Sequence, residues 1–350
     1  MSALYLHDLP RATNGDPGRR EQLLLAANAH LPSVLKRYGP FDFVYERYSL
    51  WSHAGMDYAQ TESIPGLLEV NAPLIEEQSR HRVLIDRAAA ELVAFSAFTG
   101  ATALLSVSCE VAEYLKQFAP ASRIHVVPNA IDPDRFAGEL IPSRPAPPGI
   151  FTVGFVGSLK PWHGLDILVE AFTLLCAKVR GNRLLIVGEG PEGSRLEALV
   201  RERGVGEFTE LAGRVDPQKI PGLLASMDVG VAPYPPSDRF YFSPLKVYEY
   251  MAAGITPVVS RLGQLDGLIE HGANGMLCAA GDSSSLASTL GYLREEPQLR
   301  RTLGQAARDK VLRHHTWDRV ADRILTIAGH STCPGSTRIP NCHETAAHAG

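Results

Sequence analysis

Short apolar runs alternate with longer helix-like stretches along most of this chain, and this alternation constrains the fold more than any other feature. Strands that alternate with helices are typical of parallel sheets with helices on their faces. A proline-rich stretch at 129–149, NAIDPDRFAGELIPSRPAPPG, interrupts the pattern, because proline cannot supply sheet donors or occupy helix interiors. The sequence therefore predicts an α/β protein of two doubly wound, Rossmann-like domains joined by a linker.

The two series of predicted strands are unequal. Four strands precede the linker and six follow it, and six are enough for a complete doubly wound sheet. We therefore expect an incomplete N-terminal domain at 1–128, the linker at 129–149, a complete C-terminal domain at 150–328 and a polar, disordered tail at 329–350. The predicted strands are Phe41–Glu46, Gly66–Val70, Ala103–Val107, Ile124–Val127, Phe151–Val156, Arg183–Val187, Phe208–Leu211, Val229–Ala232, Thr256–Ser260 and Gly275–Cys278.

The composition excludes several classes of protein. Of the 350 residues 45 % are apolar and 21 % are charged, and the formal net charge of −4 gives no field that would draw nucleic acid. No apolar run reaches the roughly 18 residues of a membrane span, and Asp8 and Pro10 lie where a signal peptide needs an apolar core. The five scattered cysteines form no C-x-x-C pair. We expect reduced thiols in a cytoplasmic protein.

The segment DRFYFSPLKVYEYMAAGITPVV carries the clearest pattern for chemistry. Ser243 is suited to an N-cap and Pro244 to the first position of a helix. The helix would present free amides near Leu245 and would hold Lys246 in its first turn. A cation is unfavourable there unless an anion is bound, because the helix dipole is positive at this end. The segment therefore predicts an anion site.

A second candidate loop, GSLKPWHG, follows the first strand of the same domain. Gly157 lets the backbone turn closely, Ser158 and Lys160 follow it, and His163 adds a group that changes charge near neutral pH. Such loops lie at the carboxyl edge of a parallel sheet, where ligands bind. The alternative interpretation is a solvated loop anchored by Trp162.

The segment GEGPEG satisfies the pattern G-x-G-x-x-G, with Gly188 and Gly190 on either side of Glu189. Glu210 follows about twenty residues later, as it would in a dinucleotide site. This pattern supports an oxidoreductase. The dinucleotide fingerprint belongs to the first strand of its domain, however, whereas this loop follows the second.

Taken in this order, the segments resemble the retaining family-four glycosyltransferases, which have the GT-B fold. SPLKVYEYMAAG followed by PVV resembles the donor-site helix of that family, VGEGPE resembles its nucleotide pocket, and LAGRV resembles the loop that meets the base. HVVPNAIDPDRF resembles the junction between its two domains. The resemblance covers roughly residues 41–328.

The resemblance implies roles for particular residues. It implies that Lys160 and Lys246 neutralise the donor diphosphate and that Glu249 contacts the ribose. Glu249 shares a helical face with Lys246, so a surface ion pair is the alternative. The family usually has a further glutamate where this chain has Tyr241, and often a histidine where it has Asn71. Asn71 would orient a substrate rather than act as a base, because an amide takes no proton.

The resemblance implies that the chain transfers a hexosyl group from a nucleotide diphospho-sugar to an acceptor hydroxyl, with retention and without a cofactor. The acceptor would be a lipid, a polysaccharide or a small metabolite, and with a lipid acceptor the protein would be peripheral at the membrane. The cations expected at the donor site are lysine side chains, so we expect no metal. The residues expected to contact the donor are Gly157, Ser158, His163, Gly188, Glu189, Gly190, Arg214, Val215, Tyr241, Ser243, Pro244 and Leu245.

Two other functions stay open: a non-catalytic subunit or degenerate transferase that binds nucleotide-sugar, and a nicotinamide-dependent oxidoreductase. The first domain also lacks the opening strand, glycine-rich loop and helix of the family, because nothing before Glu21 shows that pattern. We expect roughly 100 residues to be missing. A start codon assigned too late, a second chain that completes the domain, and a degenerate protein are the three explanations.

Overall fold

The computed structural model describes residues 16–237, 240–241 and 243–330. The contact pattern divides the chain into two compact units. Of the described residues, the second unit contains those from Asn129 to Phe240 and from Pro244 to Ala321, and the first contains those up to Pro128, Tyr241, Ser243 and those from Asp322 onward. The stretch predicted as a linker thus groups with the second unit, and the predicted tail lies almost wholly outside the described residues.

The second unit is built on a six-stranded parallel sheet with the order β10-β9-β8-β5-β6-β7. The order reverses at β5, as it does in a doubly wound domain. Each predicted strand is present, and the differences are confined to the ends. The strands are β5 (Phe151–Val156), β6 (Asn182–Val187), β7 (Thr209–Gly213), β8 (Val229–Ala232), β9 (Thr256–Ser260) and β10 (Met276–Cys278).

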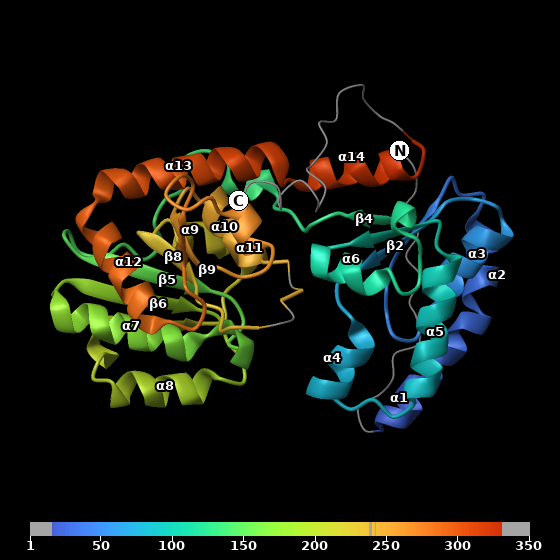
Figure 1. Cartoon of the computed structure of the whole chain (residues 1–350), viewed down its shortest axis with the longest axis horizontal. Coiled ribbons are helices and arrows are strands. Elements are labelled where there is room, and N and C mark those ends of the chain that lie inside the picture. The colour runs from blue at the N-terminus through green and yellow to red at the C-terminus, as the bar shows by residue number, and fades with distance from the viewer. Residues whose placement is uncertain (1–15, 238–239, 242, 331–350) are drawn as a thin grey trace. The chain divides into compact units, whose positions relative to one another are not determined.

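Helices cover both faces of this sheet (Figure 1). On one face α7 (Leu165–Lys178), α8 (Gly193–Glu202) and α12 (Ser283–Glu295) pack on apolar side chains of the strands and form one core. On the other lie α9 (Ile220–Leu224), α10 (Leu245–Ala252) and α13 (Pro297–His314), with α10 packed against α13. Because both faces are covered, β5, β8, β9 and β10 are buried at every position rather than at alternating ones. The remaining helices are α11 (Leu265–Leu268) and α14 (Trp317–Ile327), which begins in the second unit and ends in the first.

The first unit has a four-stranded parallel sheet in the consecutive order β1-β2-β3-β4, within the described residues. A consecutive order with right-handed crossovers places the connecting helices on one face. Accordingly, α3, α5 and α6 share a core with Leu68 and Leu104. The elements are α1 (Pro17–Ala26), α2 (Leu31–Tyr38), β1 (Val44–Arg47), α3 (Ala54–Thr61), β2 (Gly66–Val70), α4 (Leu74–His81), α5 (Arg87–Gly100), β3 (Ala103–Ser106), α6 (Cys109–Leu115) and β4 (Ile124–Val126).

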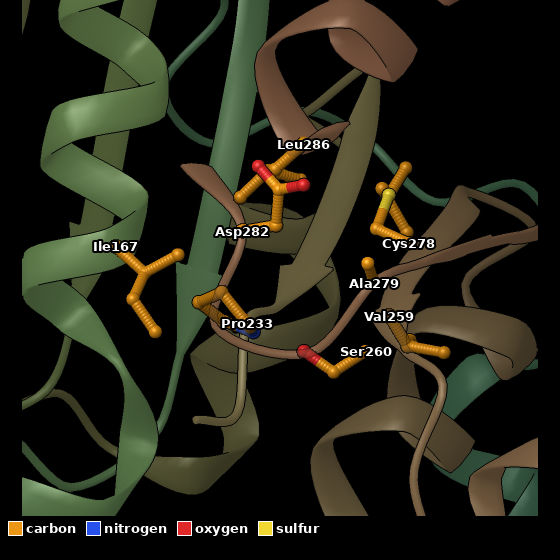
Figure 2. Close-up of a pocket in the computed structure, with 9 residues that line it drawn as sticks. Ile167, Pro233, Val259, Ser260, Cys278, Ala279, Asp282 and Leu286 are labelled. Carbon is orange, nitrogen blue, oxygen red and sulfur yellow. The ribbon is translucent and has the colours of Figure 1, made fainter. Parts of the chain in front are cut away.

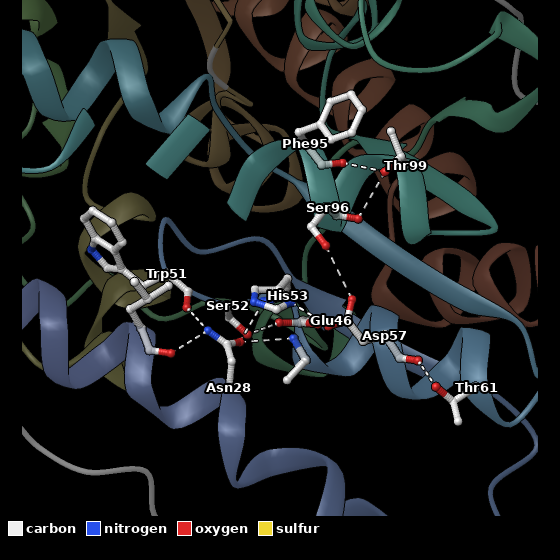
Figure 3. A network of polar contacts seen from close by, with 12 residues as sticks. Asn28, Glu46, Trp51, Ser52, His53, Asp57, Thr61, Phe95, Ser96 and Thr99 are labelled. Carbon is white, nitrogen blue, oxygen red and sulfur yellow. Dashed lines mark hydrogen bonds and ion pairs between the residues drawn. The ribbon is translucent and has the colours of Figure 1, made fainter. Parts of the chain in front are cut away.

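A network of polar side chains caps the start of α3 (Figure 3). The Asn28 carboxamide oxygen accepts hydrogen bonds from the backbone amides of His53 and Ala54, at 3.0 and 3.1 Å, and its NH2 group donates to the carbonyl of Trp51. Helix starts leave such amides without partners, so a side chain 26 residues away in sequence supplies the cap. The Glu46 carboxylate accepts from the Ser52 hydroxyl in the same network.

The cysteines depart in part from the expectation of reduced thiols. Cys176 and Cys278 are free, whereas Cys109 is disulfide-bonded, so the expectation is wrong for Cys109. Pairing depends on which Cα atoms the fold brings within about 7 Å, and spacing along the chain does not determine this.

Candidate functional site

The reversal of strand order in the second unit lies between β5 and β8, which are neighbours in the sheet. The chain leaves these two strands in opposite directions, and ligands of open α/β sheets bind beyond the carboxyl ends of the strands at such a point. The loop after β5 contains Gly157–Gly164, and the chain after β8 leads to α10. Both of the predicted lysine-bearing segments therefore belong to this edge of the sheet.

Tyr250 on α10 joins the two strands at the reversal. Its hydroxyl accepts from the Val156 amide of β5 at 3.0 Å and donates to the Val231 carbonyl of β8 at 3.2 Å. The ring lies over Gly230, where a Cβ atom would come within 2.5 Å of the ring carbon Cγ. Tyr250 thus fixes α10 to the sheet at this edge, and sequence reasoning did not single it out.

Lys246 is a buried cation one turn before Tyr250. The residue is only 8 % exposed, and its Nζ atom has no hydrogen-bond partner among the described residues. Nζ lies 4.2 Å from the ring centroid of Phe155 and 5.2 Å from that of Tyr234, where the ring quadrupoles attract it. Burial lowers the pKa of the Lys246 ammonium to about 7.

Lys246 also reaches the loop after β5. A Cβ atom on Gly157 would lie 3.2 Å from the lysine Nζ, so the glycine lets the ammonium pack closely against the loop. Gly157 has a φ of +148°, which side chains rarely adopt. Two independent requirements, backbone conformation and space, therefore favour glycine here.

The start of α10 differs from its prediction. The helix begins at Leu245, and Pro244 occupies the N-cap position without a side-chain cap bond. Ser243 is not the N-cap, so that expectation is wrong. Pro244 has a ψ of 71°, which lies outside the helical range, so the chain turns into the helix one residue later than the proline rule predicts.

His163 is neutral at physiological pH. Burial is the main cause that lowers the pKa of His163 to about 4, and the charges of Lys246 and Lys160 lower it further. A hydrogen bond of 2.5 Å between Nδ1 and the Ser158 carbonyl opposes this shift. The charges of both lysines thus oppose protonation of this imidazole. His163 itself therefore adds no charge here, contrary to the expected partial charge.

The loop after β6 packs against the loop after β5. The Leu159 amide donates to the Glu189 carbonyl at 3.0 Å, and a Cβ atom on Gly188 would overlap the Gly157 carbonyl. Gly190 faces the Leu159 backbone in the same way. This close packing explains the first two glycines of G-x-G-x-x-G without a dinucleotide, and it weakens the support for an oxidoreductase.

Arg214 and Val215 follow β7, the next strand along the sheet. The Arg214 guanidinium pairs with the Glu189 carboxylate at 3.3 Å, and both side chains are largely exposed. The Gly188 amide donates to the Gly213 carbonyl at 2.9 Å. Three consecutive loops therefore lie side by side, in the order of their strands.

Glu249 is paired with a residue that the sequence did not indicate. Its carboxylate lies 3.2 Å from the Arg135 guanidinium, and its side chain is 21 % exposed. Burial raises the pKa of Glu249, and the charge and hydrogen bond of Arg135 oppose that rise. The alternative of a surface pair with Lys246 is therefore not what the structure contains.

Two predicted residues, Asn71 and Tyr241, belong to the first unit. The Asn71 NH2 group donates to Glu69 at 2.6 Å, and its carboxamide oxygen is buried without a partner among the described residues. The Tyr241 hydroxyl donates to Glu77 at 3.1 Å.

A small, mainly apolar hollow lies at the carboxyl ends of β8, β9 and β10 (Figure 2). It includes none of the predicted site residues. Asp282 is the only charged residue among the described residues of its lining. Its carboxylate accepts hydrogen bonds from the Ser284 and Ser285 amides at the start of α12, each at 2.9 Å. The hollow is lined by Ile167, Pro233, Val258, Val259, Ser260, Cys278, Ala279, Asp282 and Leu286.

The fold defines a class of proteins. The crystal structure of HepE from Anabaena in complex with UDP and glucose is similar to this chain with a TM-score of 0.67 at 17 % identity, over 90 % of this chain and 83 % of that one. The two parallel-sheet units therefore have the GT-B fold, as predicted. Residues 150–296, which lie within the second unit, match the family model "Glycosyl transferases group 1".

Curated relatives agree with this family. The chain is 29 % identical over 160 residues to N-acetyl-alpha-D-glucosaminyl L-malate synthase of Bacillus anthracis. The matched region is 46 % of this chain and 40 % of that relative. It is 26 % identical over 287 residues to glycogen synthase of Mycobacterium tuberculosis, over 80 % of this chain and 66 % of the relative. The matched regions thus span less than two thirds of either relative. In the described part of the chain, every helix is too short or too polar to cross a bilayer.

Proposed function

We propose that this chain transfers a sugar from a nucleotide diphospho-sugar to an acceptor hydroxyl, with the donor bound by the second unit. The observation that carries this proposal is the buried Lys246 ammonium at the reversal of the sheet, without a hydrogen-bond partner among the described residues. Burying a cation without an anionic partner is costly. An anion at this position would offset that cost, and a diphosphate is the anion that the family's donors carry.

Preorganised charge would supply the chemistry. Cleavage of the sugar–phosphate bond places negative charge on the leaving diphosphate, and the Lys246 and Lys160 ammonium groups with the free amides at the start of α10 would stabilise it. Lys246 needs no reorganisation, because its aromatic surroundings already hold it in place. The Glu249 carboxylate would accept hydrogen bonds from the ribose.

We further propose that the reaction retains anomeric configuration, needs no metal or cofactor, and takes place in the cytoplasm. The positive charge of the two lysines would replace a metal ion at the diphosphate. Proton NMR of the first product formed reports the anomer, and turnover in excess EDTA reports the metal requirement. An inverted anomer or loss of turnover in EDTA would remove the corresponding part of this proposal.

The direct test is calorimetric titration of the full chain with UDP, GDP and ADP, alone and as hexose conjugates. We expect one base series to bind, and Lys246→Ala to weaken its binding by roughly 10- to 100-fold, the value of a hydrogen bond to a charged group. Lys178→Ala, at the end of α7, is the matched control and should bind normally. Unchanged affinity in Lys246→Ala would refute the assignment of the site.

A second candidate function is donor binding without transfer. Tyr241 stands where the family usually has a glutamate, and its hydroxyl is engaged with Glu77. Tight donor binding with neither transfer nor hydrolysis of the sugar, across lipid, polysaccharide and small-molecule acceptors, would favour this candidate. Binding of NAD with no nucleoside diphosphate binding would instead revive the oxidoreductase.

A further inference from the structure

Glu249 is held by an arginine from a distant part of the chain. Arg135 lies in the short 3-10 helix η3 (Pro133–Phe136), 114 residues before Glu249, and both belong to the second unit. One guanidinium nitrogen, Nη1, donates to Glu249 Oε1 at 3.2 Å. The other, Nη2, donates to the Pro217 carbonyl at 2.8 Å. The guanidinium is therefore fixed at two points.

The segment that carries Arg135 is itself anchored to α10. Arg308 on α13 donates through Nη2 to the Phe136 carbonyl at 2.6 Å and through Nη1 to the Ala252 carbonyl at the end of α10. Phe136 is fully buried, and the Arg135 guanidinium lies 5.5 Å from its ring centroid. The distance between η3 and α10 is thus set by packing and by a second arginine, independently of the Arg135–Glu249 contact.

This arrangement leaves part of the carboxylate available. An ionised carboxylate has about four acceptor positions, and Arg135 takes a hydrogen bond on Oε1 alone. A planar guanidinium held at both ends also restricts the rotation of its partner. Glu249 Oε2 would therefore be presented in one orientation and in its ionised, accepting form.

We propose that Arg135 is a positioning residue for nucleotide recognition: it holds Glu249 ionised and oriented so that the carboxylate selects donors with ribose hydroxyls. This rests on the proposed donor site. Without Arg135 the buried carboxylate would lose the charge that opposes its protonation, and the pKa of Glu249 would rise further. A carboxyl group that is protonated or free to rotate accepts ribose hydroxyls poorly.

The experiment compares two ligands in each variant of the full chain. The nucleoside diphosphate that binds tightest among UDP, GDP and ADP is titrated beside its 2′,3′-dideoxy counterpart, which lacks the hydroxyls. In the unaltered protein we expect the dideoxy compound to bind roughly tenfold or more weakly, as for a lost hydrogen bond to a charged group. In Arg135→Met this ratio should fall below about threefold.

The controls separate positioning from folding. Arg135→Lys keeps the charge but not the two-point contact, so an intermediate ratio is expected. Arg203→Met removes a comparable ion pair, with Glu170 at 3.0 Å, at the end of α8, and should leave the ratio unchanged. A merely structural role for Arg135 would weaken both ligands equally, and an unchanged ratio in Arg135→Met overturns the inference. If no nucleotide binds the unaltered protein, the proposed function fails instead.

Discussion

Lys246 has surroundings that fit the proposed anion site. Its ammonium lies between the rings of Phe155 and Tyr234, and the only nearby titratable imidazole, within the described residues, is the neutral His163. A lysine side chain that serves stability alone would place its charge in water. The sequence pointed to Lys246 through its unfavourable place in the first helical turn, and the structure adds that the charge is buried.

A pH dependence follows from the lowered pKa of Lys246, about 7 in the free protein. A lysine is charged below its pKa, so affinity for an anionic donor should be constant below pH 7. It should then fall by up to about tenfold per pH unit above pH 7, because binding must then take up a proton. The measurement is calorimetry with a nucleotide-sugar whose phosphates do not titrate between pH 6 and 8.5.

Lys246→Arg is the control for this dependence. An arginine stays charged throughout the range, so any binding that remains should no longer change with pH. The same decline in both proteins would show that another group titrates.

At the scale of secondary structure, the strands were predicted well and the caps less well. The strands Gly66–Val70 and Thr256–Ser260 were found at the predicted bounds, because most of their residues are apolar, as in buried parallel strands. The start of α10 was missed by a residue, because Pro244 adopts a ψ that no local rule specifies. The cap of α3 was also missed, since Asn28 reaches it only in the folded chain.

The attachment of α10 to the sheet gives a prediction about stability. Tyr250→Phe removes the hydroxyl that bridges β5 and β8 and leaves the buried Val156 amide without a partner. We expect a loss of about 1–3 kcal/mol in the free energy of unfolding, the cost of an unsatisfied buried group. A urea titration measures it. Tyr292→Phe, on the exposed face of α12, should change stability by less than about 0.5 kcal/mol, and a similar loss in both would contradict the bridging role.

At the scale of the whole molecule, the second unit contains a six-stranded sheet, its own core and every predicted site residue except Asn71, Tyr241 and Ser243. A compact unit with its own core is expected to fold alone. Residues 129–321 expressed alone should therefore unfold cooperatively and bind the nucleotide within about threefold of the full chain. Circular dichroism and calorimetry check this. Failure to fold would mean that the first unit contributes to the core of the second.

The sequence by itself determined the class of fold, the number and place of the strands in the second unit, and which loops hold lysines, glycines and acids. These are local properties, because the spacing of apolar residues and the backbone needs of glycine and proline act within a few residues. Only the tertiary structure decided the order of the strands and thus which loops meet at the reversal. It also decided that Arg135 and Glu249 form a pair and that His163 is neutral. Such properties depend on contacts and burial between distant segments, which a linear pattern does not encode.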